Sequence, residues 1–535
     1  HKMGKTIYKT FQATAEYNKT IGGHTFGILA GYSWEQEDYR YVQGSRDKFP
    51  GNDLPYLNAG SPDNQKSEGT GNAWAIQSGF GRLRYNFNER YLFESTVRYD
   101  GSSRFPQSKK FGFFPSVAAG WRLSEENFFK ENESLGFISN LKLKVSWGRL
   151  GNQNIGNYPY QSVYELGQNY PFGDTYTQGA AVTTAVDPTI KWEETETIDG
   201  GLEAVFWNGL LSVNASYFNR RTYDILYKPS GSVSTILGQK ISEMNTGELK
   251  NFGWEFEVGH RNKIGDVSYN VNANLSIIKN KLTTLGVGNV EQLNGMVGNG
   301  SDLFIGYPIQ MYYGYVSDGV FLDENDIKSW YDQSKVTPNP QPGDIRYKDI
   351  SGPDGVPDGK IDPNYDRVYL GSRIPKFTFG LNLGVEYKGL DLSVLLQGVA
   401  GVTGMLDGFA GWAFRGDGNI QKWQAEGRFD PANPTRYPAY PRLEDLSNST
   451  TPNIVTSDFW TQDASYIRLK NIQLGYTFPK KMLQAAKISN LRVYVQAENP
   501  LCWNKYKPGW DPEINTSGNY YPILATYTFG VNFKF

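Results

Sequence analysis

The chain has 535 residues and a formal net charge of −2, so its overall charge does not indicate binding to nucleic acid. Only 39% of the residues are hydrophobic, and no run approaches the roughly 20 consecutive apolar residues of a membrane-spanning helix. The single cysteine, Cys502, excludes an internal disulfide framework. The opening residues HKMGKTIYKT contain no apolar signal-peptide core, so we expect that the chain begins inside a longer protein or that its start is missing.

Alternation between apolar and polar residues predicts an all-β chain. In DVSYNVNANLSI, for example, Val267, Tyr269 and Val271 alternate with serine and asparagine, and good helix patterns are few. The pattern predicts about fifteen strands. They are expected near residues 5–18, 24–38, 73–87, 90–101, 111–123, 140–150, 191–206, 210–226, 248–262, 266–281, 376–388, 390–401, 466–479, 490–500 and 525–535.

The last predicted strand, ATYTFGVNFKF, sorts its side chains onto two faces. One face holds Tyr527, Phe529, Val531, Phe533 and Phe535, and the other holds Thr528, Asn532 and Lys534. Segments of about ten residues with one apolar and one polar face are typical of transmembrane strands in a closed antiparallel β-barrel. The first face is therefore expected to meet lipid and the second a wet lumen. A soluble β-sandwich or propeller also alternates, but its strands average about five or six residues.

Short and long connections alternate along the chain. The short ones are expected at 21–23, 88–90, 207–209, 262–266 and 388–390, with two longer, partly helical ones at 124–140 and 479–490. The long ones are expected at 39–72, 102–110, 151–190, 227–247, 282–375, 402–465 and 499–524. Outer-membrane barrels have short periplasmic turns and long extracellular loops, an even number of strands and both ends in the periplasm. The odd count therefore predicts that residue 1 lies at the loop side, after an odd number of further strands.

Five stretches resemble the SusC-like (RagA-like) TonB-dependent outer-membrane transporters of Bacteroidota. They are VRYDGSSRFPQSKKFGFFPSVAAGWRLSEENFF (97–129), VSWGRLGNQNIGNYPY (145–160), MNTGELKNFGWEFEV (244–258), FIGYPIQMYYGYVSDGVF (304–321) and YYPILATYTFGVNFKF (520–535). The resemblance covers essentially the whole chain. It implies that residues 1–535 are the C-terminal part of a 22-strand barrel, without the plug, the TonB box and the first strands. It also implies that Phe535 belongs to a signal read by the barrel-assembly machinery.

The function that the resemblance implies is nutrient import at the bacterial outer membrane. Such transporters take up oligosaccharides or peptides under a SusD-like surface lipoprotein lid, are driven by TonB through the N-terminal region, and usually form a dimer of barrel–lid pairs. Their other contacts would be the missing plug and barrel segment and the outer-membrane lipid. The alternatives are a TonB-dependent siderophore or vitamin receptor without a lid, a passive porin, and an adhesin or structural surface protein.

The sequence shows no motif of an enzyme. Histidine occurs three times, at His1, His24 and His260, and there is no HExxH motif, His/Cys cluster or nucleophile elbow. Enzymatic activity is therefore not expected.

The acidic segment KDISGPDGVPDGKIDPNYDR, residues 348–367, is a candidate cation site. Its carboxylates recur every four or five residues, at Asp349, Asp354, Asp358, Asp362 and Asp366. Hard oxygen ligands on a tightly turning backbone suit a structural Ca²⁺ or Mg²⁺, although the segment lacks the glutamate at the twelfth position of an EF-hand loop. The alternative is a solvated cluster of turns, in which Asp and Gly serve the backbone geometry.

Two aromatic segments are candidates for substrate binding. GFAGWAFRGDGNIQKWQAEGRFD (408–430) and DFWTQDASY (458–466) contain Trp412, Phe414, Arg415, Trp423 and Trp460. Aromatic faces stack on sugar rings or pack on peptide side chains, and arginine pairs with carboxylates. The alternative is that these side chains pack within the loops or against a partner protein.

Overall fold

The structure is a computed structural model that describes residues 1–228, 238–286, 290–291, 296–298, 303–445, 451–484, 487–506, 509–514 and 521–535. Parts of the loops predicted over 227–247, 282–375, 402–465, 479–490 and 499–524 lie outside these ranges. Strands dominate the described residues, which confirms the all-β class. No helix in these ranges is long and apolar enough to cross a membrane.

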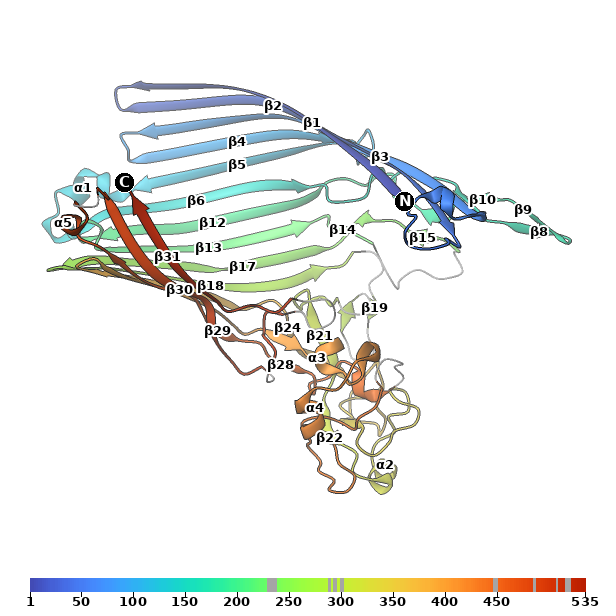
Figure 1. The fold of residues 1–535 in the computed structure, drawn as a ribbon. Helices are drawn as coiled ribbons and strands as arrows, with labels where there is room; N and C mark the ends of the chain where they lie inside the picture. The colour runs from blue at the N-terminus through green and yellow to red at the C-terminus, as the bar shows by residue number, and fades with distance from the viewer. Residues whose placement is uncertain are drawn as a thin grey trace. The chain divides into compact units, whose positions relative to one another are not determined.

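Fifteen strands follow one another in a single antiparallel sheet, as Figure 1 shows. They are β1 (Lys2–Ile21), β2 (His24–Asp47), β3 (Ser61–Phe87), β4 (Tyr91–Ser102), β5 (Phe111–Arg122), β6 (Ile138–Asn152), β12 (Glu193–Phe206), β13 (Leu211–Tyr223), β17 (Glu248–Ile264), β18 (Val267–Thr284), β25 (Phe377–Tyr387), β26 (Leu390–Ala400), β29 (Tyr466–Thr477), β30 (Asn490–Asn504) and β31 (Thr526–Lys534). The order in the sheet is the order in the chain, so the sheet is an up-and-down meander. The predicted strands are confirmed, and β25 differs from its predicted range by one residue at each end.

The hairpin of β2 and β3 is longer than the sequence pattern predicts. A loop is expected over 39–72, but β2 continues to Asp47 and β3 already begins at Ser61. The register pairs Gln43 with Glu68 across this stretch. The segment SPDNQKSEGTGN has weak strand propensity, yet its backbone groups complete an antiparallel ladder with β2 because ladder hydrogen bonds do not depend on the side chains.

β1 begins at the loop end of its hairpin with β2. The tight turn of this hairpin, at 22–23, lies at the far end of β1, and Gly22 there has a φ of +58° that favours glycine. The ammonium group of His1 donates a hydrogen bond to the Gly44 carbonyl at 2.8 Å, and His1 Nε2 lies 2.6 Å from the Pro55 carbonyl oxygen. Residue 1 therefore lies beside the longer connection, 48–60, as the strand count predicts.

The strands β25, β26, β29, β30 and β31, called the strand wall below, have one apolar and one polar face. The register aligns Val385, Leu392, Leu474, Val495 and Phe529 in one row across the five strands. All five of these side chains are exposed. The adjacent row on the other face consists of Gly384, Ser393, Gln473, Gln496 and Thr528. The predicted sorting of side chains in the last strand thus extends over the whole wall.

The chain divides into two compact units. The first consists of His1–Glu126, Leu143–Gly200 and Arg220–Glu248, and the second consists of Asn127–Lys142, Gly201–Asn219 and Leu249–Phe535. The loops of the first unit carry β7 (Glu165–Leu166), β8 (Tyr170–Phe172), β9 (Thr175–Thr177), β10 (Ala180–Ala181), β11 (Thr184–Ala185), β14 (Leu226–Tyr227), β15 (Lys240–Ile241) and β16 (Met244–Asn245). A small core of this unit is formed by Phe105, Phe114, Ile155, Ile190 and Trp192.

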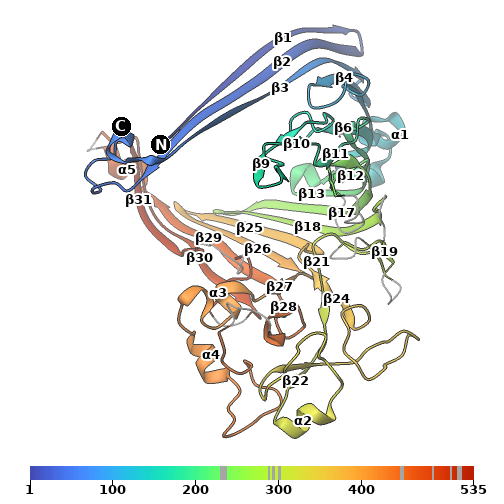
Figure 2. The ribbon, with the colours of Figure 1, turned by 90° about the vertical axis from the view of Figure 1, so that its right-hand side faces the viewer.

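The connections of the second unit contain its short helices and further short strands. These are α1 (Asn127–Lys130), β19 (Val290–Glu291), β20 (Val297–Gly298), β21 (Met311–Tyr315), β22 (Ser317–Val320), α2 (Glu324–Ser329), β23 (Ile345–Tyr347), β24 (Arg367–Ser372), β27 (Thr403–Met405), α3 (Gly408–Gly411), α4 (Lys422–Gly427), β28 (Thr461–Asp463) and α5 (Lys480–Leu483). In Figures 1 and 2, β22, α2, α3 and α4 gather into one body of loops.

Candidate functional site

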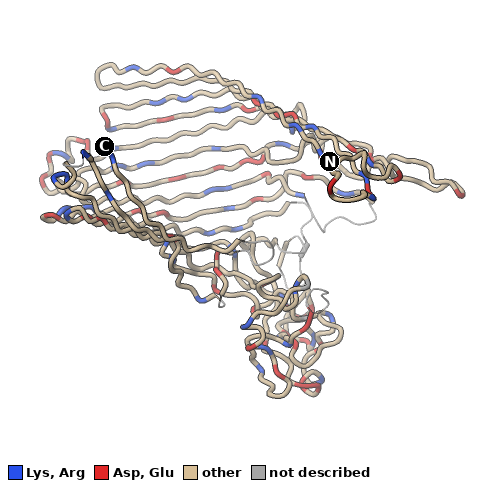
Figure 3. Tube along the Cα trace, viewed as in Figure 1, with Lys and Arg blue, Asp and Glu red and all other residues tan. Residues whose placement is uncertain are grey.

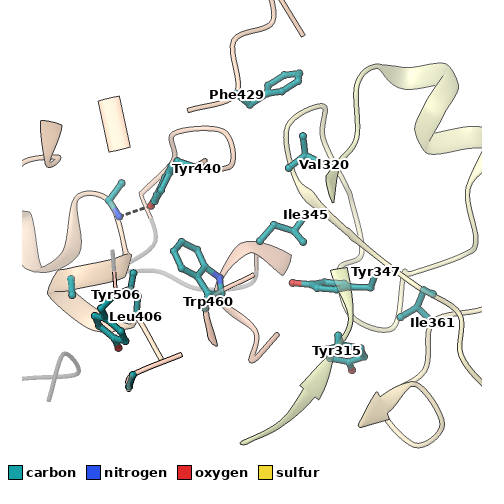
Figure 4. Close-up of a cluster of buried hydrophobic side chains, with 13 residues drawn as sticks. Tyr315, Val320, Ile345, Tyr347, Ile361, Leu406, Phe429, Tyr440, Trp460 and Tyr506 are labelled. Atoms are coloured by element: carbon teal, nitrogen blue, oxygen red, sulfur yellow. Dashed lines mark hydrogen bonds between the residues drawn. The ribbon is translucent and has the colours of Figure 1, made fainter. Parts of the chain in front are cut away.

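Loops from three parts of the second unit share one hydrophobic core, called the loop core below. Its buried residues are Tyr315, Val320, Ile345, Tyr347, Ile361, Leu406, Ala410, Ala413, Phe429, Tyr440, Trp460, Ala464 and Tyr506. Figure 4 shows Trp460 between Tyr440 and Ile345. Backbone hydrogen bonds tie the loops together, for example from Tyr315 N to the Thr456 carbonyl at 3.0 Å. These long loops therefore fold into a packed body.

Trp460 is the largest fully buried side chain of the loop core. It is 1% exposed, and its ring meets that of Tyr440 edge-on at a centroid distance of 5.7 Å. Its Nε1 donates a hydrogen bond of 2.7 Å to the Asn453 carbonyl, so burial leaves its polar atom satisfied. The structure thus places this predicted substrate-binding residue in the packing of the loops.

Trp412 and Trp423 line the loop core without being fully buried. Trp423 Nε1 donates to Gln421 Oε1 at 3.0 Å, and Trp510 Nε1 donates to the same oxygen at 3.0 Å. The Gln421 amide also donates to the Ala410 carbonyl at 3.0 Å. Gln421 therefore joins two tryptophans to α3, a role that sequence analysis missed because a lone glutamine has no pattern around it.

Phe414 is the exposed member of the predicted aromatic set, and Arg415 beside it is half-buried. Phe414 is more than one third exposed and has the left-handed backbone angles φ 58° and ψ 16°. The Arg415 guanidinium lies 5.3 Å from the centroid of the Trp412 ring, a cation–π contact. Phe409, nearly half exposed, was not predicted but precedes them on the same loop. Substrate binding by the five predicted residues stays a prediction, and Phe414 is the one of them with an exposed side chain.

An ion-pair network holds α2 to the loops that follow it. Arg346 Nη1 lies 3.0 Å from Asp326 Oδ1, and Arg436 pairs with both oxygens of the same carboxylate. Arg346 also pairs with Asp318 and stacks on Trp330 at 3.7 Å from the ring centroid. Burial alone would raise the pKa of Asp326, but the hydrogen bonds from Arg436 and from the Leu322 N–H, with the two guanidinium charges, hold it below its ordinary value.

A second carboxylate of the loop body, Asp344, is fully buried. Burial raises its pKa, although the Gln341 N–H, Arg442 and Asn453 all donate hydrogen bonds to its charged form. The Asn453 amide also donates to Glu444 at 2.6 Å, so these polar groups form one network. A buried network of this kind specifies one arrangement of the loops, because each unpaired member would cost free energy.

The acidic segment 348–367 satisfies its carboxylates mainly with backbone N–H groups. Asp366 accepts hydrogen bonds from the N–H groups of Ile350, Ser351 and Asp362 at 2.7, 3.1 and 2.6 Å. Burial raises the pKa of Asp366 in spite of these bonds. Asp349 Oδ2 accepts from the Gly359 N–H at 2.6 Å.

The remaining carboxylates of the segment have separate partners or face solvent. Asp358 accepts from the Lys360 N–H at 3.0 Å, Asp362 pairs with Lys335, and Asp354 is exposed on a turn. Within the described ranges, no group of three or more His, Cys, Asp or Glu side chains is placed to hold a metal ion. The arrangement therefore does not fit a gathered cation site, and a Ca²⁺ or Mg²⁺ ion here stays a prediction that only a binding experiment tests.

The polar face of the strand wall contains a charged hollow of about 650 Å³ near the short turns. Arg492 pairs with Asp391 through Nη2 and Nε at 2.5 and 3.0 Å, and Lys388 lies 3.3 Å from Asp266. Sequence analysis did not single out these residues. The available signal was the placement of charges on the polar face next to the turns at 262–266 and 388–390. Figure 3 shows charges of both signs along the strands and over the loop body.

Comparison with protein families gives a match over most of the chain. The family model described as "TonB dependent receptor-like, beta-barrel" matches residues 3–499. TonB-dependent receptor P3 of Formosa agariphila is 28% identical over 560 residues, which cover 97% of this chain and 51% of that protein. TonB-dependent receptor SusC of Bacteroides thetaiotaomicron is 28% identical over 542 residues, which cover 99% of this chain and 50% of that protein. The chain thus spans about half the length of the curated relatives it matches.

Solved structures of the same fold are also similar. The RagAB peptide importer in its "open-open" state gives a TM-score of 0.79 at 24% identity, covering 100% of this chain and 55% of the matched chain. A structure of the RagAB peptide transporter gives a TM-score of 0.77 at 24% identity, covering 99% and 55%. At this identity the likeness shows the fold alone.

Proposed function

Since the chain belongs to the TonB dependent receptor-like, beta-barrel family, whose place is the outer membrane, we propose that it supplies the strand wall and outer loops of a SusC-type nutrient importer. The observation that carries the proposal is the similarity to SusC over 99% of this chain. The aligned residues include the loops as well as the strands. Loops are where importers of one family differ in what they bind.

The two faces of the strand wall support a transport role. An exposed row such as Val385, Leu392 and Leu474 suits lipid hydrocarbon, whereas the row of Ser393, Gln473 and Gln496 on the other face suits water. A wall of this kind offers a polar path across the membrane. The charged hollow near the short turns lies on that polar face and involves Arg492 and Asp391.

The partners of the importer form the second part of the proposal. We assign it a SusD-like surface lipoprotein as a lid, TonB as the source of energy, and a dimer of barrel–lid pairs as its assembly. The plug and the TonB-contacting segment would lie in the half of the relatives' length that this chain does not span. The packing of the loops supports the proposal of a lid. A partner protein needs a rigid binding surface, and the shared hydrophobic core holds these loops rigid.

The substrate class we propose is oligosaccharides or peptides. The exposed Phe414 and the half-buried Arg415, next to Trp412, offer an aromatic face and a cation on neighbouring residues. An aromatic ring binds a sugar face or an apolar peptide side chain, and a guanidinium pairs with a carboxylate. Replacement of Phe414 and Arg415 by alanine should therefore weaken uptake by about tenfold, while Tyr437→Ala, on another exposed loop position, should leave it unchanged.

Uptake by whole cells tests the proposed function. A strain that lacks the gene, and the same strain carrying the full-length protein, are supplied with fluorescently labelled oligosaccharides or peptides. We expect uptake only with the full-length protein, and we expect a protonophore to abolish it because the inner-membrane gradient energises TonB. Uptake that persists with the protonophore would instead identify a passive channel, and the absence of uptake for both substrate classes would reject the proposal.

A further inference from the structure

The loop between β6 and β12 carries an exposed apolar hairpin, defined here as residues 163–181. Antiparallel pairing joins β8 to β9 and β7 to β10, so the segment is folded. The β8–β9 turn consists of two residues, and Gly173 adopts a φ of +60° that such turns require. The hairpin is therefore regular secondary structure and not an irregular loop.

The large side chains of this hairpin face solvent. Their exposed fractions are 62% for Val163, 73% for Tyr164, 83% for Leu166, 64% for Tyr170, 68% for Phe172 and 77% for Tyr176. Tyr170 and Phe172 contact each other edge-on at 5.2 Å between ring centroids. In the register of the pair, Tyr170 and Phe172 share one face, and Tyr176 lies on the other. Large apolar side chains exposed side by side, as Tyr170 and Phe172 are, mark an interaction site. Tyrosine and phenylalanine are also the residues that interface cores favour.

The charges around the hairpin limit the kind of molecule that can bind over it. The sequence has no basic residue between Arg149 and Lys191, and the hairpin itself carries Glu165 and Asp174. Figure 3 accordingly shows the β8–β9 hairpin almost entirely in tan. Segments that lie on a membrane surface carry Lys and Arg on their polar side, because the lipid headgroups are anionic. The charge of this hairpin therefore disfavours lipid as its occupant.

The same charges disfavour a second copy of the chain. In a two-fold symmetric contact the two hairpins would meet each other, and Glu165 and Asp174 would face carboxylates of their own kind. A complementary partner instead has an apolar recess for the aromatic side chains and Lys or Arg residues at its rim.

We propose that the apolar hairpin is a docking element for the lipoprotein lid. This inference rests on the proposed function and adds the surface that holds the lid. The side chains of Tyr170 and Phe172, which share one face of the β8–β9 pair, fill an apolar recess of the lipoprotein, and Glu165 and Asp174 pair with basic side chains around it. Aromatic anchors of this type dominate the affinity of protein interfaces, and rim charges mainly set partner choice and association rate.

The test measures binding of the SusD-like lipoprotein to the full-length transporter in detergent. In Tyr170→Ser/Phe172→Ser, the affinity should fall by about tenfold or more. In Glu165→Lys/Asp174→Lys, association should slow by about tenfold at low salt, and the loss should shrink as salt is added. The matched controls are Leu54→Ser/Tyr56→Ser and Asp53→Lys, on an exposed connection of the same unit, which should bind as the wild type. Folding of each variant is checked by its resistance to sodium dodecyl sulfate before heating.

The outcomes separate the inference from the proposed function. If the wild type binds the lipoprotein and both hairpin variants bind equally well, the docking role is wrong and the proposed function stands. If the wild type does not bind the lipoprotein, the lid itself is wrong and the inference falls with it. A photo-crosslinker placed at Thr177, which shares the face of Tyr170, gives a second readout. A crosslink to the lipoprotein supports the inference, and crosslinks only within the transporter, to lipid or to a second copy overturn it.

Discussion

The strand wall and the loop core belong to the same unit and use similar residues in opposite ways. In the wall, Phe529 is 71% exposed and lies in a row of exposed apolar side chains, whereas Trp460 in the loop core is 1% exposed. Burial of apolar surface stabilises a protein in water, so the loop core is what a water-exposed body needs. The wall leaves its apolar surface open because its solvent on that side is hydrocarbon. The exposed fraction of an apolar side chain therefore has to be interpreted together with the solvent, water or hydrocarbon, that its surface meets.

Trp460→Ala should destabilise the protein more than any of the changes that follow. A small effect would contradict the contrast between the loop core and the strand wall. Removal of a fully buried tryptophan costs about 3–5 kcal/mol of unfolding free energy because a cavity remains. Trp503→Ala, at a more than half-exposed position of the wall, should cost less because it leaves no cavity inside a packed core. A urea titration followed by circular dichroism, with hydrogen exchange of 311–347, measures both. Equal effects would show that the loops do not depend on the loop core.

Val531→Arg tests the solvent of the exposed face. The change should cost about 2–4 kcal/mol if the position lies near the bilayer midplane, because an arginine must then enter hydrocarbon. The control is the next residue, Asn532→Arg, which points to the polar face and should be close to neutral. Folding titrations into lipid vesicles measure both variants. A neutral Val531→Arg would place this residue away from the membrane interior.

Asp326→Asn should weaken the loop body by a smaller amount, about 1.5–3 kcal/mol, because Arg346 and Arg436 lose a shared charged acceptor. The folded-state pKa of Asp326 lies below its unfolded value of about 3.8, so its stabilising effect is present above that pH and is lost as the pH falls through the folded pKa. Wild-type protein should therefore lose loop stability on acidification more steeply than the variant. Limited proteolysis from about pH 5 down to about pH 2 compares the two, because the loss occurs below the unfolded pKa, and parallel pH profiles would contradict the assignment.

A chelator should have the smallest effect. If Ca²⁺ or Mg²⁺ orders the segment 348–367, chelation should speed its proteolysis and added Ca²⁺ should restore resistance. The hydrogen bonds to Asp349 and Asp366 from backbone N–H groups predict instead that chelation leaves the cutting unchanged. We expect the second result. Faster cutting with chelator, reversed by Ca²⁺, would establish the metal site in spite of this geometry.

The strands could be predicted from the sequence because their pattern is local. In a strand such as β25, alternating apolar and polar residues mark the two faces, so the ends of the strand can be placed within one residue. The outer parts of β2 and β3 could not be predicted, because SPDNQKSEGTGN shows no alternation and becomes a strand only through its partner. Local pattern thus fixes a strand whose side chains are sorted by solvent and fails where the backbone alone forms the ladder.

The candidate site could be predicted only as a set of residue types. The sequence identifies Trp412, Phe414, Arg415, Trp423 and Trp460 as aromatic or cationic loop residues, but burial separates them into core and surface. The contacts that decide this are remote in sequence: Ser317 bonds to Asp458 across 141 residues. The carboxylates of 348–367 show the same limit of sequence analysis. Their spacing is typical of metal-binding loops, but Asp366 accepts hydrogen bonds from backbone N–H groups instead.

The separation between bonded residues of the ion-pair network around α2 has a consequence for the order of folding. Asp326 and Arg436 are 110 residues apart, and β25 and β26 lie between them in the chain. Closing so long a loop in an unstructured chain is slow and costs entropy, and pairing of the intervening strands shortens the effective distance. We therefore expect the wall to assemble first and the loop core to pack last. Until then its aromatic side chains stay open to water, which makes this stage the one most exposed to aggregation and to proteases.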